Sequence, residues 1–246
     1  MASNVSYARG QPLLEVFHVR VNKIDGQDPG FYGTIDIADS AGTEVLWKRD
    51  KSNAIDIQPG EDFLLEGPSR AMYAADEFSI NVELSNSPND VFAKHTISFN
   101  PFDYYTEYDV VHNHEVSGDH GSVSVNYMAI GDAFIGQIKV IVTGDNENPA
   151  SVHGNITASN GHGQSELFRR ANNQSANVEP QHPIPLLRTA VAVPSSSALV
   201  VDASLWESSD NEIARGSVEF QPEYKKSESK YITGARGKIE VQVSWR

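Results

Sequence analysis

The sequence contains no cysteine, which excludes disulfide bonds, thiol chemistry and cysteine-ligated zinc sites. It also contains no apolar run long enough for a transmembrane helix, because the longest, residues 134–142, is interrupted by Gly136, Gln137 and Lys139. The first residues lack the apolar stretch that is typical of a secretory signal. We therefore expect a cytoplasmic protein without a transmembrane segment, unless a leader has been removed.

The common catalytic motifs are missing as well. There is no Gly-x-Ser-x-Gly elbow, no Walker loop, no His-Glu-x-x-His and no Gly-x-Gly-x-x-Gly that opens a helix. The sequence therefore predicts a protein that is not an enzyme. A hydrolase built on scattered carboxylates stays open as an alternative, because a sequence does not place two carboxylates at glycosidase spacing.

Basic residues are few, with 19 Lys and Arg against 33 Asp and Glu, for a net charge of −14. This charge repels phosphate backbones and anionic bilayers, so nucleic acid is not expected as a partner. Hydrophobic residues make up 39% and charged residues 21%, as in folded globular proteins. The 246 residues are enough for two domains that each bury a core.

The chain matches itself without gaps at an offset of 121 residues. Apolar residues also meet apolar residues where the two copies differ, as with Phe63 and Ile184. This agreement indicates an internal duplication in which both copies bury the same face. The identical pairs include Gly33 and Gly154, Ile35 and Ile156, Leu46 and Leu167, Leu84 and Leu205, and Pro101 and Pro222.

Apolar and polar residues alternate with period two through both copies, with turn residues between the alternating runs. This pattern predicts an all-β fold of two tandem antiparallel β-sandwich domains, at residues 8–130 and 131–246. A turn is expected at Gly131 and Asp132. The residues predicted to form the cores are Phe17, Val19, Ile35, Ile80, Val82, Ile97, Ile138, Val140, Ile156, Val201 and Val218.

Both copies carry an aromatic residue followed by two basic residues at the end of a hairpin strand. An exposed ring beside a guanidinium would suit a sugar, a base or an anion as ligand. The alternative is a core aromatic residue whose basic neighbours pair with acidic loops. The two triplets are Trp47, Lys48 and Arg49, and Phe168, Arg169 and Arg170.

Acidic residues gather around the first hairpin. Clustered carboxylates on sandwich loops are the ligands that Ca²⁺ prefers, so calcium is the one cofactor that the sequence suggests. In the second copy, Thr157 and Asn160 replace two of the acids, and a solvated turn is the alternative. The candidate ligands are Asp25, Asp28, Asp36 and Asp39.

Two histidines, His112 and His114, stand two positions apart in a polar segment. On a strand they would share a face and suit a divalent metal. The second copy has a five-residue deletion near this segment, so a longer loop is the alternative interpretation.

The segment Gly67, Pro68, Ser69 and Arg70 occurs in the first copy only. Proline fixes its own φ and disfavours helix at the preceding residue, which suits a tight loop. With five donors, Arg70 can tie this loop to carbonyls or to a carboxylate. We therefore predict a structural role for the segment.

Four segments resemble a family of uncharacterised plant domains, found mainly in grasses. They are residues 14–21 (LEVFHVRV), 32–35 (YGTI), 63–71 (FLLEGPSRA) and 237–245 (GKIEVQVSW). In some members the domain follows a ribosome-inactivating N-glycosidase domain. The resemblance implies no catalytic residues and suggests an accessory, targeting or defence role.

Together these patterns favour a non-catalytic binding module for a glycan or glycoprotein in a defence context. A duplicated module gains avidity when its geometry permits. The alternative is a calcium-dependent membrane or partner binder with a C2-like sandwich. The sequence leaves the oligomeric state open.

Overall fold

The computed structural model describes residues 9–26, 30–87, 90–143, 150–207 and 211–246. Its regular elements are β-strands, apart from the short 3-10 turns η1 (Lys51–Asn53) and η2 (Asn172–Gln174). The predicted all-β class is therefore confirmed. No helix within these ranges is both long and apolar enough to cross a membrane.

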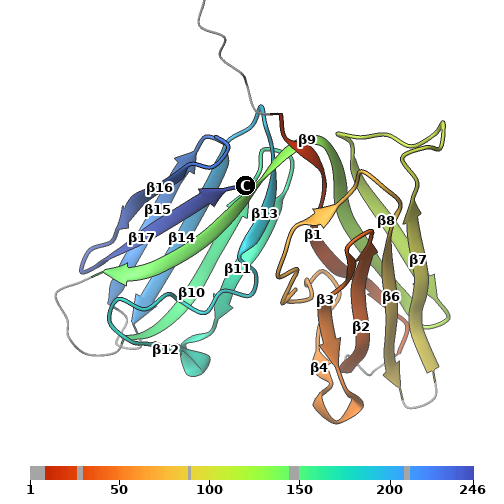
Figure 1. Ribbon diagram of the computed structural model, residues 1–246. Helices are drawn as coiled ribbons and strands as arrows, with labels where there is room; N and C mark the ends of the chain where they lie inside the picture. The colour runs from red at the N-terminus through yellow and green to blue at the C-terminus, as the bar shows by residue number, and fades with distance from the viewer. Residues whose placement is uncertain (1–8, 27–29, 88–89, 144–149, 208–210) are drawn as a thin grey trace, which may run out of the picture.

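We call the described residues up to 130 the first half and those from 131 the second half. One seven-stranded antiparallel sheet runs through both halves of the molecule (Figure 1). Its centre is β9, whose first part pairs with β1 and β8 and whose second part pairs with β13 and β17. Five of its strands follow the order β16-β17-β9-β1-β5, and the other two, β8 and β13, pair with β9 outside this order. The members are β1 (Gln11–Ile24), β5 (Met72–Tyr73), β8 (Val111–Gly118), β9 (Gly121–Thr143), β13 (Ala190–Pro194), β16 (Ser227–Thr233) and β17 (Lys238–Trp245).

Each half is completed by a five-stranded antiparallel sheet of its own. The sheet of the first half has the order β3-β2-β6-β7, with β4 beside β2, and that of the second half has the order β11-β10-β14-β15, with β12 beside β10. The strands of the first are β2 (Gly30–Asp39), β3 (Gly42–Arg49), β4 (Ile55–Asp56), β6 (Phe78–Ser87) and β7 (Asp90–Phe99). Those of the second are β10 (Ala150–Ser159), β11 (Gln164–Arg170), β12 (Ala176–Val178), β14 (Leu199–Glu207) and β15 (Glu212–Phe220).

The prediction of a turn at Gly131 and Asp132 is wrong, because β9 continues through both residues. The ladder between β1 and β9 shifts register at this point, with Gln11 opposite Ala133 and Leu13 opposite Ile130. One extra residue on β9 is accommodated there as a bulge. The turn-forming pair therefore bends the strand where one half meets the other.

Local geometry recurs at the offset of 121 residues. Gly33 has a φ of 125° and Gly154 a φ of 116°, and a Cβ on either would lie 2.1 Å from a carbonyl oxygen of the neighbouring strand. The hairpin β2–β3 has a register shift after Ile35, and the hairpin β10–β11 has one after Ile156. The 3-10 turns η1 and η2 stand at the same offset. Both halves therefore use the same strand geometry, as a duplication requires.

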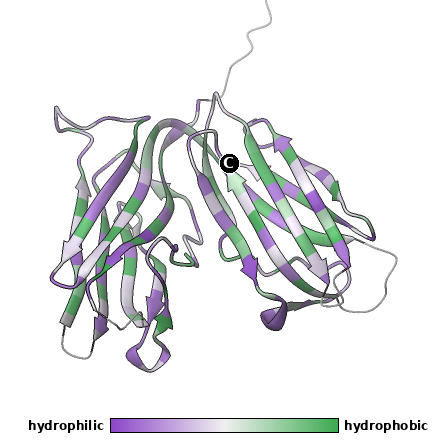
Figure 2. Cartoon of the chain, turned by 180° about the vertical axis from the view of Figure 1, so that it is seen from behind, coloured by the Kyte–Doolittle hydropathy of each residue, from purple (hydrophilic) through white to green (hydrophobic). Residues whose placement is uncertain are grey.

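Buried side chains form one core in each half and a third cluster between the halves. The alternation of apolar and polar residues along the strands is visible in Figure 2. Of the predicted core residues, ten are buried and Val218 is partly buried. The cluster between the halves, which we call the seam, consists of Leu13, Phe17, Met128, Ile130, Ala133, Ile135, Ala190 and Ala192.

The domain bounds 8–130 and 131–246 stay a prediction. Residue 8 lies outside the described residues, and the boundary at 130 falls inside β9.

Candidate functional site

The aromatic residues of the two predicted triplets lie in the cores. Trp47 is 0% and Phe168 is 1% exposed, and the Trp47 ring lies 5.0 Å from the ring of Phe63. The prediction of a stacking platform at these residues is therefore wrong. The physical reason is alternation, because the aromatic positions of β3 and β11 face inward and the residues directly after them, Lys48 and Arg169, face outward.

Two of the four basic residues of the triplets pair with carboxylates, as the alternative interpretation proposed. The Arg49 guanidinium donates to both oxygens of Glu66, at 2.5 and 3.1 Å. The Nε of Arg169 lies 3.2 Å from Oε1 of Glu166. The two remaining members, both exposed, are Lys48 and Arg170.

The candidate calcium ligands are not brought together. Asp25 pairs with Lys23 at 2.7 Å, and the Nδ2 of Asn81 donates to Oδ1 of Asp36 at 2.8 Å. Asp28 lies outside the described residues. Within the described ranges no group of three or more histidine, aspartate or glutamate side chains could hold a metal ion. The predicted calcium site is therefore not formed by the described residues.

The two histidines of β8 pack against different rings. His112 stacks on Tyr127 at 5.1 Å between ring centroids, and His114 stacks on His95 at 5.2 Å. Burial lowers the pKa of His114, and the neighbouring imidazoles lower it further. The arrangement suits packing and does not assemble a metal site from the two residues.

Arg70 has the structural role that the sequence predicts. Its guanidinium donates two hydrogen bonds of 2.8 Å to the carboxylate of Asp39 and one of 2.9 Å to the carbonyl of Gly42, and it pairs with Glu44 at 3.3 Å. Burial would raise the pKa of Asp39, but hydrogen bonds from Arg70 and from the N–H groups of Tyr73 and Ala41 together lower it. Arg70 thus fixes the segment that leads into β5.

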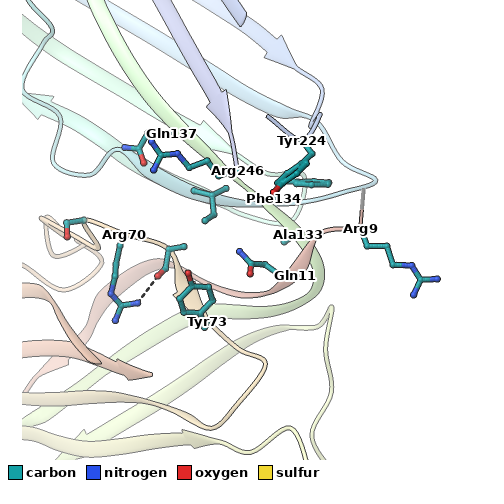
Figure 3. Close-up of a pocket in the computed structure, with 13 residues that line it drawn as sticks. Arg9, Gln11, Arg70, Tyr73, Ala133, Phe134, Gln137, Tyr224 and Arg246 are labelled. Atoms are coloured by element: carbon teal, nitrogen blue, oxygen red, sulfur yellow. Dashed lines mark hydrogen bonds between the residues drawn. The ribbon is translucent and has the colours of Figure 1, made fainter. Parts of the chain in front are cut away.

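A cleft of about 500 Å³ opens where the two halves meet (Figure 3). We call it the junction cleft. Polar side chains from both halves face it. The first half contributes the start of β1 and the residues before and within β5, and the second half contributes the turn before β16 and the end of the chain. The middle of β9 lies between them. The polar and aromatic residues that line it include Gln11, Arg70, Tyr73, Gln137, Tyr224 and Arg246.

Backbone contacts fix the walls of the junction cleft. A Cβ on Gly10 would lie 2.4 Å from the carbonyl oxygen of Ala133, so only glycine lets the start of β1 approach β9 so closely. The backbone N–H of Arg246 donates to the carbonyl of Ile135, and the Ile135 N–H donates to the Arg246 carbonyl, at 3.1 and 2.9 Å. The last residue is therefore held against β9.

The junction cleft is rich in donors that the protein itself leaves available. Among the described residues, the guanidinium groups of Arg9 and Arg246 form no ion pair, although the chain carries a net charge of −14. Arg9 lies at the rim and points away, whereas Arg246 extends toward Gln137 (Figure 3). Tyr224 is 49% exposed, and none of the described lining side chains is a carboxylate. The cleft therefore offers guanidinium and amide donors beside aromatic rings.

A second groove between the halves, of about 450 Å³, has a different character. Its charged side chains are paired, with Arg20 at 2.7 Å from Asp62 and Arg169 at 3.2 Å from Glu166. Burial raises the pKa of Glu166, and Arg169 opposes the rise. Because these charges already satisfy one another, the groove offers a ligand less than the junction cleft does.

A buried ion pair fastens the two halves below these surfaces. Arg188, 2% exposed, lies 3.3 Å from the carboxylate of Glu15 and donates to the carbonyl of Phe17 at 3.0 Å. Glu15 also accepts from the hydroxyl of Ser165 at 2.5 Å and from the N–H of Ala192 at 2.8 Å. Burial raises the pKa of Glu15, while Arg188 and these hydrogen bonds oppose the rise. The pair sets how the halves sit on either side of the junction cleft.

Sequence reasoning missed the junction cleft. Its polar residues, from Gln11 to Arg246, are spread over almost the whole chain, so no short motif joins them. Arg70 was singled out only for its structural role. The one signal in the sequence was the pair Gly131 and Asp132, which marked the place where the halves meet.

Residues 13–243 match a family model described as "Domain of unknown function (DUF6598)". No curated protein sequence matches the chain.

Solved structures similar to this chain include "Extended-Synaptotagmin 2, C2A- and C2B-domains", at 10% identity and a TM-score of 0.31, covering 100% of this chain and 96% of that one. A longer form, "Extended-Synaptotagmin 2, SMP - C2A - C2B Domains", has 11% identity and a TM-score of 0.29, and this chain spans 59% of it. "Human GIVD cytosolic phospholipase A2" has 7% identity and a TM-score of 0.27, with 97% of this chain and 33% of that one covered. Likeness at this level carries no functional argument.

Proposed function

The chain belongs to the DUF6598 family of domains of unknown function, and we propose that it is a non-catalytic module that binds a glycan in the junction cleft. One observation carries the proposal. Both halves supply planar polar groups and tyrosine rings to a single concave surface that has no carboxylate side chain among its described lining residues. Ligand sites are typically concave, with a few polar groups that converge on the ligand.

The chemistry of the lining fits a sugar. Hydroxyl groups both accept and donate hydrogen bonds, and the amides of Gln11 and Gln137 offer both functions. The guanidinium of Arg246 donates to hydroxyl or carboxylate oxygens. The rings of Tyr73 and Tyr224 supply rigid apolar faces that carry a polar hydroxyl group. Gln137 already donates to Thr189 at 2.7 Å, which holds its amide in place.

The same lining supports binding without catalysis. General acid–base catalysis needs a side chain that titrates near the working pH, most often histidine or a carboxylate. The described residues of the junction cleft include neither of these side chains. We therefore propose that a bound glycan is retained unchanged.

A defence role is the setting that we propose for this activity. It rests on the resemblance of four segments to plant domains that in some proteins follow a ribosome-inactivating domain. An accessory module that holds a glycan would direct such a protein to a glycosylated target. The proposal is tested by asking whether extracts of attacking organisms contain glycans that the module binds.

The direct experiment is a glycan array probed with the full chain, followed by calorimetric titration of the glycan that binds best. Tyr224→Ala and Gln11→Ala, which alter opposite walls of the junction cleft, are expected to weaken binding at least about tenfold each. The reason is that each removes a ring face or an amide donor, and about 1.4 kcal/mol corresponds to a factor of ten.

The matched control is Tyr231→Ala. This tyrosine is 54% exposed on β16, close to the exposure of Tyr224, and does not line the cleft. Its replacement is expected to leave binding unchanged. An array without hits for folded protein, or binding that survives both cleft variants, would contradict the proposal.

A further inference from the structure

The loop of residues 100–106, between β7 and β8, presents three aromatic side chains to solvent. Phe102 is 80%, Tyr104 92% and Tyr105 87% exposed. We call this segment the aromatic loop; it is the yellow-green loop that extends beyond β7 and β8 in Figure 1. Single exposed aromatic residues are ordinary, but a contiguous group marks an interaction surface.

The tip of the aromatic loop is held by its own hydrogen bonds. The side-chain oxygen of Asn100 accepts from the N–H of Phe102 at 2.9 Å, and its carbonyl accepts from the N–H of Asp103 at 3.1 Å. The carbonyl of Asp103 accepts from the N–H of Thr106 at 3.1 Å. A loop ordered before binding loses little conformational freedom when a partner arrives.

The base of the aromatic loop is anchored to the sandwich. The Tyr108 hydroxyl donates to the carbonyl of Ala74 at 2.5 Å, and the Tyr108 ring packs edge-on against Phe99 at 5.3 Å. Asp109 accepts from the N–H of Gly131 at 3.0 Å. The exposed rings therefore project from a fixed platform.

The surroundings of the aromatic loop are acidic. Residues 100–110, which connect β7 to β8, contain three aspartates and glutamates and no lysine or arginine. Asp103 is exposed within the loop and Glu107 is exposed just beyond it. Burial raises the pKa of Tyr108, and the charge of Asp76 raises it further, which places another carboxylate beside the base. Exposed ring faces next to carboxylates favour a cation.

The matching turn of the second half carries different side chains at the positions of the three rings. At an offset of 121 residues, Phe102 corresponds to Glu223, and Tyr104 and Tyr105 correspond to Lys225 and Lys226. The one exposed aromatic residue of that turn, Tyr224, stands where the first half has Asp103. The fold therefore does not need aromatic residues at the three positions where the first half exposes them.

We propose that the aromatic loop docks a segment of another protein that carries arginine or lysine side chains. The cations lie over the ring faces of Tyr104 and Tyr105, and the carboxylates of Asp103 and Glu107 complement their charge. The two tyrosine rings meet edge to face at 5.3 Å, which leaves ring faces accessible. This surface is separate from the junction cleft and needs no glycan.

The probe is a fluorescent peptide of alternating arginine and glycine, titrated with the full chain at low and high salt. Its counterpart of alternating glutamate and glycine is the charge control. We expect the arginine peptide to bind and the glutamate peptide not to bind, with weaker binding at high salt because exposed charges are screened. The double variant Tyr104→Ser/Tyr105→Ser is expected to lose at least about tenfold in affinity.

Two further variants separate the contributions. Asp103→Asn/Glu107→Gln keeps the rings, and should weaken binding at low salt and flatten its salt dependence. Tyr231→Ser removes an exposed tyrosine of the second half and should change nothing. All these variants alter exposed side chains, so equal melting temperatures provide the check on folding.

Several outcomes would overturn the inference. One is that the wild type and the double tyrosine variant bind the arginine peptide with equal affinity. Another is that the arginine peptide does not bind at all. Binding to phosphatidylcholine vesicles that the tyrosine variant abolishes, without peptide binding, would assign the loop to a membrane surface instead. Sedimentation showing self-association that depends on Tyr104 and Tyr105, again without peptide binding, would assign it to a second copy of this chain.

Discussion

The two halves of the molecule use arginine differently at the segment that joins their sheets. In the first half, Arg70 is partly exposed and pairs with Asp39 of the same half. In the second half, Val191 and Asn160 stand at the corresponding positions, and the buried guanidinium of Arg188 reaches across to Glu15. An arginine therefore holds a loop in the first half, whereas in the second half an arginine holds the other half of the molecule.

The second half has a neutral side chain, Asn160, at the position that corresponds to Asp39. The Nδ2 of Asn160 donates to the carbonyl of Ala192 at 3.0 Å, and its Oδ1 accepts from His162 and Gly163. An amide can satisfy itself with backbone groups alone, whereas a buried carboxylate needs a cation or several donors. The same position of the fold is therefore compatible with a charged pair in the first half and with a neutral amide in the second.

The largest expected effect concerns the pair across the seam. Arg188→Ala or Glu15→Ala should each lower the free energy of unfolding by about 3–5 kcal/mol, because a buried charge loses its partner. Denaturant titration measures the loss. Arg20→Ala, which breaks the exposed pair with Asp62, should cost less than about 1 kcal/mol. Equal losses for Arg188→Ala and Arg20→Ala would show that the buried pair of Arg188 and Glu15 contributes no more to stability than an exposed pair does.

The next effect tests the equivalence of the halves at one backbone position. Gly33→Ala and Gly154→Ala should each cost more than about 1 kcal/mol, because alanine disfavours positive φ and its Cβ would meet a carbonyl oxygen. Gly60→Ala, with a φ of 90° and no atom within 4 Å of the added Cβ, should cost less. A loss at only one of the two matched glycines would break the equivalence.

A smaller effect is expected when the residues of the second half are placed at the matching positions of the first half. Arg70→Val should cost about 1–3 kcal/mol, because it leaves the Asp39 carboxylate without its charged donor. The double variant Asp39→Asn/Arg70→Val imports the residues of the second half and should cost less than Arg70→Val alone. Thermal melts of the two variants measure the difference, and a double variant that is the less stable would reject this account.

The smallest effect is a pH dependence confined to the first half. The pKa of Asp39 in the folded protein lies below its ordinary value of 3.8, so its pair stabilises the fold above that pH and is lost as the pH falls through the lowered value. Between about pH 5 and pH 2.5 the wild type should therefore lose more stability than Asp39→Asn/Arg70→Val does. If both proteins lose the same free energy of unfolding over this pH range, the pair of Asp39 and Arg70 does not make stability depend on pH.

The sequence predicted most of the fold and the role of Arg70, because both depend on local patterns. Period-two alternation identified the buried faces of the strands, including Ile35 and Ile156. The same alternation argued for burying Trp47 and Phe168, so the stacking platform contradicted the pattern that supported the fold.

The junction cleft was beyond sequence reasoning for a different reason. Its residues come together only because β9 continues through Gly131 and Asp132, where local residue preferences favour a turn. Burial of apolar residues on both sides of that pair, such as Ile130 and Ala133, outweighs the local preference. A cleft between two halves depends on how they are joined, and a period-two pattern carries no information on that.

The most direct test of the proposed function is hydrogen exchange of the full chain with and without the glycan that binds best on an array. We predict slower exchange of backbone amides around Gln11, in the middle of β9 and in the turn at Tyr224, which together surround the junction cleft. Amides of the aromatic loop should exchange at unchanged rates. Protection confined to the aromatic loop or to the outer strands, with none around the cleft, would contradict the proposal that both halves hold one ligand between them.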